Sequence, residues 1–99
     1  MNPSLPHGLT LDQVRKYLDN RTQEFGGLGG AIARKDAAGL RMLAHRIKGN
    51  AALYGMPELG LCAARVVDAV DAGDWAAVSE KVDAMISRLA EERARFAST

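Results

Sequence analysis

The segment Leu40–Gly55 constrains the fold most, because its apolar residues recur at intervals of three and four. That spacing is typical of one buried helical face. A helix turns by about 100° per residue, so His45 points roughly 160° away from the centre of this face, toward solvent. An imidazole in that position adds little to a core and needs another role. The apolar positions are Leu40, Leu43, Ile47, Ala51 and Tyr54.

The outward strip around His45 carries almost no bulk. Ala38, Gly49 and Ala52 lie on it, one or two turns from the imidazole. A glycine inside a helix costs about 1 kcal/mol relative to alanine. We therefore interpret Gly49 as a position that a second molecule must approach closely.

Positive charge surrounds the same strip. Arg41 and Lys48 flank it, and Arg46 follows His45 directly. No carboxylate lies one turn from His45 to orient the ring as in a catalytic triad. These residues favour an exposed imidazole in a local field that suits an anionic group.

A known signature includes these residues. The run His45-Arg46-Ile47-Lys48-Gly49, preceded by Leu43-Ala44 and followed by Gly55, resembles that of histidine-containing phosphotransfer (HPt) domains. The resemblance extends from about Leu11 to Phe96. It departs from many family members at Val66-Val67, where they carry a Leu-Glu pair.

The resemblance implies a function in phosphorelays of the two-component type. HPt domains carry a phosphoryl group on histidine between aspartates of receiver domains. By that resemblance His45 is the phosphoryl acceptor, Lys48 supports the phosphate electrostatically, and Gly49 leaves room for the receiver. Arg41, Arg46 and Ala52 are the expected partner-binding residues, since the two arginines would attract the acidic pocket of a receiver.

The implied partners are response-regulator receiver domains and a hybrid sensor histidine kinase. We expect the chain to bind no cofactor itself, while Mg²⁺ would sit on the receiver. The chain has no nucleotide-binding domain, so we expect a phosphoryl carrier rather than an ATP-dependent kinase. We also expect a monomer, and no metal site, because no second histidine or cysteine lies at ligand spacing from His45.

Composition limits the other function classes. With 99 residues and 47% hydrophobic residues the chain suits a single globular domain. A net charge of +1 argues against general binding of nucleic acid, and no apolar run is long enough to span a membrane. The single Cys62 is interpreted as a small core residue, and it fits a reducing, cytoplasmic environment.

Four amphipathic segments predict an all-α fold, an antiparallel up-down-up-down four-helix bundle over residues 10–97. Residues 1–9, which include His7, are expected to form a flexible tail. A capping box at Thr10-x-x-Gln13 starts the first helix, which we expect to run to about Lys35. The glycines within residues 26–30 make a kink or break the main alternative, and close helix packing is the favoured reason for them.

The remaining boundaries follow from capping residues. Asp36 is expected to cap the helix that carries His45, and Gly55 to end it in a left-handed conformation. Pro57 opens the third helix, and Ala72-Gly73-Asp74 forms the turn before the last one. On that last helix a solvated face is expected for Glu91, Glu92, Arg93 and Arg95.

Two other functions stay open at this point. A degenerate relative would bind a receiver or another partner through the same face without accepting phosphate. A kinase dimerisation domain would form an obligate dimer, although such helices usually place an acidic residue where this chain has Arg46.

Overall fold

The computed structural model describes Leu5 and residues 8–97, and this part of the chain is helical with no strand. Most of the expected tail at residues 1–9, including His7, lies outside the described residues. The elements are α1 (Leu11–Phe25), α2 (Leu28–Ala33), α3 (Ala37–Asn50), the 3-10 helix η1 (Ala51–Tyr54), α4 (Pro57–Asp71) and α5 (Trp75–Ala97).

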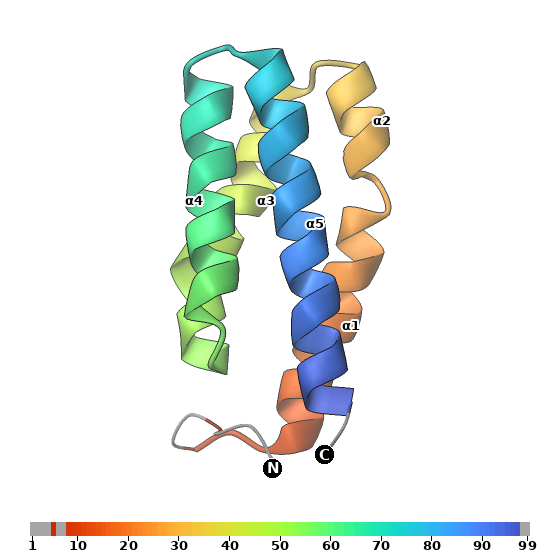
Figure 1. Ribbon diagram of the computed structural model, residues 1–99, viewed down its shortest axis with the longest axis vertical. Coiled ribbons are helices and arrows are strands. Elements are labelled where there is room, and N and C mark those ends of the chain that lie inside the picture. The colour runs from red at the N-terminus through yellow and green to blue at the C-terminus, as the bar shows by residue number, and fades with distance from the viewer. Residues whose placement is uncertain (1–4, 6–7, 98–99) are drawn as a thin grey trace.

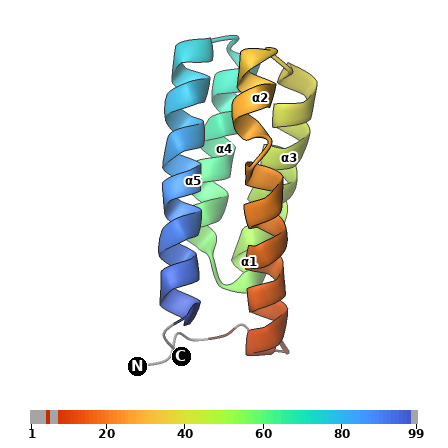
Figure 2. The same ribbon diagram turned by 90° about the vertical axis from the view of Figure 1, so that its right-hand side faces the viewer.

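The helices run side by side as four rods, one of which is made of α1 and α2 placed end to end (Figure 1). Successive rods run in opposite directions along the long axis of a body measuring 40 × 20 × 18 Å. Figure 2 shows α1 and α2 stacked along one edge of the bundle, with α3 on one side and α5 on the other. The predicted antiparallel four-helix bundle is therefore confirmed.

The first helix is interrupted, so the expectation of one continuous helix to about Lys35 is wrong. It ends at Phe25, a turn at Gly26 and Gly27 follows, and α2 closes at Ala33. Adjacent glycines weaken a helix because they lose the most backbone freedom on ordering. The apolar register nevertheless survives the break, since Phe25 and Leu28 are both buried.

Close helix packing does not explain the glycines of this segment, contrary to our expectation. A Cβ placed on Gly26 or Gly27 would meet only backbone oxygens of its own turn. At Gly29 it would meet nothing within 4 Å, and at Gly30 only the side chain of Arg34. No neighbouring helix comes close enough to any of these positions to require a glycine.

The predicted capping residues are confirmed. Thr10 and Gln13 form the capping box of α1, and the Asp36 carboxylate accepts from the Gly39 N–H at 3.0 Å. Gly55 ends η1 at a φ of 80°, and α4 begins at Pro57. The α-helix that carries His45 is shorter than expected, because it ends at Asn50 and continues to Gly55 as a 3-10 turn.

The core lies on the axis between the rods and is formed by residues that are at most 8% exposed. Packing is most extensive between α3 and α4 and between α4 and α5, so α4 is the helix that packs most against its neighbours. The largest fully buried side chains include Phe96, Leu40, Ile47, Met56, Leu59 and Met85.

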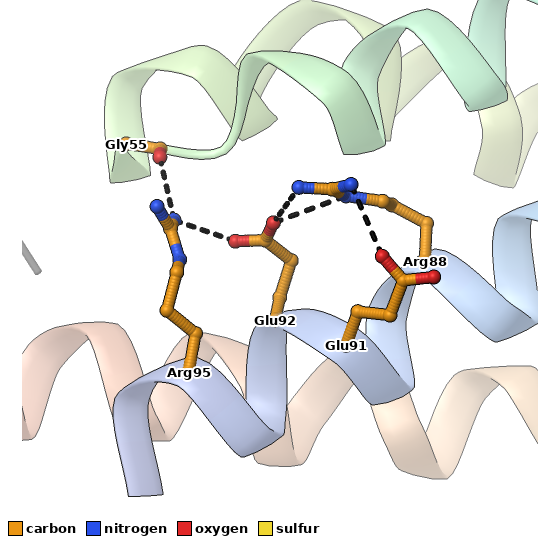
Figure 3. Close-up of polar contacts among 5 residues, drawn as sticks. All are labelled: Gly55, Arg88, Glu91, Glu92 and Arg95. Carbon is orange, nitrogen blue, oxygen red and sulfur yellow. Dashed lines mark hydrogen bonds and ion pairs between the residues drawn. The ribbon is translucent and has the colours of Figure 1, made fainter. Parts of the chain in front are cut away.

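Glu92 belongs to this core, so its expected place on a solvated face is wrong. Its side chain is 1% exposed because position 92 continues the inward-facing spacing of Leu89 and Phe96. Arg88 donates to one carboxylate oxygen at 2.6 Å and Arg95 to the other at 2.6 Å (Figure 3). Arg95 also donates to the Gly55 carbonyl at 3.1 Å, which links α5 to the turn after η1.

We predict that Glu92→Gln lowers the free energy of unfolding by about 1–2 kcal/mol, because two charge-assisted hydrogen bonds are weakened in a buried setting. Glu91 is the matched control, since its side chain is 65% exposed and it contacts the same Arg88. Glu91→Gln should change the free energy by less than about 0.5 kcal/mol. Urea denaturation followed by circular dichroism measures both. Equal effects of the two substitutions would show that the buried carboxylate has no special role.

Candidate functional site

Burial of one face of α3 determines which of its side chains reach solvent. Leu40, Ala44 and Ile47 are at most 1% exposed and pack into the core. Leu43 is partly buried against the same core, as the apolar spacing predicted. His45 lies on the opposite face and is exposed, which confirms the orientation deduced from the helical register.

The imidazole of His45 is open to a second molecule. Within the part of the chain that the structure describes, no hydrogen bond and no ion pair involves His45. Ala38 and Ala52, on the same outward strip, are exposed and end at Cβ. Both ring nitrogens therefore keep their hydrogen-bonding or nucleophilic capacity for a partner.

Gly49 has no packing reason to be glycine. It is exposed, and a Cβ built on it would meet nothing within 4 Å. It lies in the last turn of α3 rather than in mid-helix, so its cost in helix propensity is smaller than the sequence suggested. The bare backbone one turn from His45 is thus free surface rather than a contact within the bundle.

The three cations near His45 are held in different ways. Arg41 donates from Nε to Asp71 Oδ1 at 2.8 Å, and this bond raises the pKa of the Arg41 guanidinium above its ordinary value. Arg46 lies 3.7 Å from a carboxylate oxygen of Glu24. Lys48 is exposed and has no ion-pair partner within 4.0 Å among the described residues.

Two exposed apolar side chains, Met42 on α3 and Leu53 on η1, were missed by the sequence analysis. Met42 is 63% exposed and Leu53 is 68% exposed, the two most exposed large hydrophobic residues of the described chain. By helical register Met42 lies about 60° from His45, on the side away from Lys48. The signal was present in the sequence, since both residues fall out of phase with the buried face.

Side chains from α1 anchor the C-terminal end of α3. The Tyr17 hydroxyl donates to Asn50 Oδ1 at 2.6 Å, and the Tyr17 ring stacks on Tyr54 with 4.1 Å between centroids. Burial raises the pKa of Tyr17, so its phenol stays protonated and remains a donor. The Arg21 guanidinium also lies over the Tyr17 ring, 4.7 Å from its centroid. These contacts explain why the segment after Gly49 is fixed although its helix changes to 3-10 geometry.

Other kinds of site find no support in the described residues. They contain no group of three or more His, Cys, Asp or Glu side chains that could hold a metal ion. No helix among them is long and apolar enough to cross a membrane. Cys62 is partly buried and packs against the core as a free thiol.

An exposed imidazole without a hydrogen bond or ion pair among the described residues, one turn from Lys48 and Gly49, can act as a nucleophile toward an anionic group that a partner brings. Comparison with curated proteins and with solved structures gives no significant match. A family model described as "Hpt domain" matches residues 9–95, which is nearly the whole chain and includes every residue of the site. The chain belongs to the Hpt domain family.

Proposed function

We propose that this chain is a phosphoryl carrier in which His45 accepts a phosphoryl group from a receiver-domain aspartate and passes it to another. The observation that carries the proposal is the exposed His45 imidazole, unbonded among the described residues, one turn from Lys48 and Gly49. Family membership supports it, because Hpt domains act in phosphorelays. In this proposal the chain transfers phosphate without any ATP-dependent kinase activity of its own.

The chemistry needs one nucleophilic nitrogen and local positive charge. The unprotonated nitrogen of the neutral imidazole uses its lone pair to form a P–N bond. The P–O bond to the aspartyl group breaks at the same centre, and its electron pair returns to the aspartate as a carboxylate. Transfer onward is the reverse of this step with a second receiver. Lys48 stabilises the phosphoryl oxygens, since positioning and charge neutralisation are the main demands of phosphoryl transfer.

The surface around His45 suits a partner with an acidic pocket and an apolar rim. Met42 and Leu53 supply exposed apolar area, which is the kind of surface that marks protein interaction sites. Arg46 and Ala52 extend the same face with a cation and a small side chain. We propose that a receiver docks here and contributes the Mg²⁺ ion, so that this chain binds no cofactor itself.

The first prediction concerns the acceptor. His45→Gln should abolish labelling by a receiver domain that has been phosphorylated with acetyl phosphate, because the amide cannot replace the nucleophilic nitrogen. Helicity should be unchanged, since the side chain lies outside the core. His7→Gln is the matched control, because His7 is the other histidine of the chain, and it should label normally. Label that persists in the His45 variant would refute the assignment.

A second prediction concerns Gly49. Gly49→Leu should slow phosphoryl transfer by about tenfold or more, because an added side chain would displace the partner from attack geometry. The bundle should remain folded, since a Cβ at this position meets open space. Rapid mixing with a labelled receiver, followed by quenching at set times, measures the transfer rate, and urea denaturation measures stability.

Gly49→Ala separates bulk from backbone effects. This variant should keep most of the transfer rate and be as stable as the wild type or more stable by up to about 1 kcal/mol. Gly39→Ala is the contrasting substitution, because a Cβ there would clash with the Asp36 carboxylate that caps α3. A normal transfer rate in Gly49→Leu would show that clearance at this position is not needed.

A further inference from the structure

The ion pair between Arg41 and Asp71 joins the helix of His45 to the end of α4. Arg41 Nε lies 2.8 Å from Asp71 Oδ1, and its terminal nitrogen Nη2 lies 3.5 Å from Oδ2. Both side chains are 49% exposed. Pairs with that exposure contribute little to stability, because water and salt screen them. The guanidinium can therefore exchange its partner without unfolding the bundle.

Arg41 is placed to reach a group carried by His45. Residues four apart on a helix have Cβ atoms about 5–6 Å apart and share a face. Helical side chains also lean toward the N-terminus, so the imidazole leans over the turn that carries Arg41. A phosphoryl group on His45 would thus lie within the range of the long arginine side chain.

The other arginine of this region is less well placed. By helical register Arg46 lies about 100° from His45, and its guanidinium faces Glu24 of α1. Arg41 lies only about 40° from His45, on the side of Lys48. Arg41 is consequently the cation whose partner would change when the negative charge at His45 changes.

Asp71 holds its arginine weakly compared with a phosphoryl group. It carries one negative charge and is the last residue of α4, where the helix dipole disfavours an anion. A phosphoryl group carries about −1.5 to −2 charges and three acceptor oxygens that match the guanidinium fork. Competition between the two anions should favour the phosphoryl group.

We propose that Asp71 is a positioning residue for phosphoryl transfer, holding Arg41 against α4 while His45 is free and releasing it to the phosphoryl group on phosphorylated His45. This inference rests on the proposed function of His45. Arg41 stabilises the phosphorylated chain, and Asp71 opposes that stabilisation by competing for the same guanidinium. The pair thereby sets the equilibrium of the phosphoryl group between the chain and its receiver.

The test measures the equilibrium constant of transfer between a receiver domain, phosphorylated with acetyl phosphate, and variants of the full chain. This constant does not depend on how tightly the two proteins dock, so a docking role of Arg41 would not move it. Arg41→Gln should shift the equilibrium toward the receiver by about two- to fivefold, and Asp71→Asn should shift it toward the chain by a similar factor. Asp71→Glu should restore the wild-type value.

A double variant separates release of Arg41 from simple loss of negative charge. In the Arg41→Gln background, Asp71→Asn should change the equilibrium no more than Asp68→Asn does. Asp68 is the matched control, because it is an exposed carboxylate one turn earlier on α4 with no ion pair among the described residues.

Two results would overturn the inference while leaving the proposed function intact. One is normal labelling of every variant with an unchanged equilibrium constant. The other is an Asp71→Asn effect of the same size with and without Arg41. If the wild-type chain takes no label from any phosphorylated receiver tested, the proposed function fails and the inference fails with it.

Discussion

The one-sided burial of α3 is the constraint on which the site depends. Leu40 and Ile47 are both buried in the core, and only one rotation of α3 about its axis buries both side chains. α4 packs closely against this helix at Gly60, where a Cβ would lie 3.6 Å from the Lys48 carbonyl oxygen. With the rotation set in this way, His45 has no direction to face except solvent. The exposure of the imidazole is thus a consequence of core packing on the other side of the helix.

Polar contacts from two other helices, α1 and α5, hold the segment that follows the site. The Tyr17 hydroxyl bonds to Asn50 from α1, and Arg95 of α5 bonds to the Gly55 carbonyl (Figure 3). Glu92 orients Arg95 from a buried position, and the charge of the Arg95 guanidinium neutralises the charge of the Glu92 carboxylate. The end of the His45 helix is therefore tied to its neighbours, and a partner meets a surface that is already arranged.

Charge around His45 is less uniform than a count of basic residues suggests. Arg41 and Arg46 each face a carboxylate from a neighbouring helix, while Lys48 has no such partner within the described chain. Lys48 alone thus offers its charge to an incoming anion without breaking an ion pair first. The arginines first have to leave their carboxylates, which makes their contribution depend on what the partner brings. This division of the three cations arises between helices and has no counterpart in the spacing of the sequence.

Local patterns in the sequence determined the helical class, the caps at Thr10, Asp36 and Gly55, and the outward direction of His45. All of these depend on residues within a few positions of one another, where helical periodicity is a reliable guide. The break at Gly26–Gly27 was recognised only as an alternative, because propensity and apolar register pointed in opposite directions. The burial of Glu92 and the pairing of Arg41 with Asp71 were decided only by the tertiary structure. Asp71 lies on a different helix from Arg41, and the burial of Glu92 depends on how far the packed face of α5 extends along that helix, so helix packing decides both.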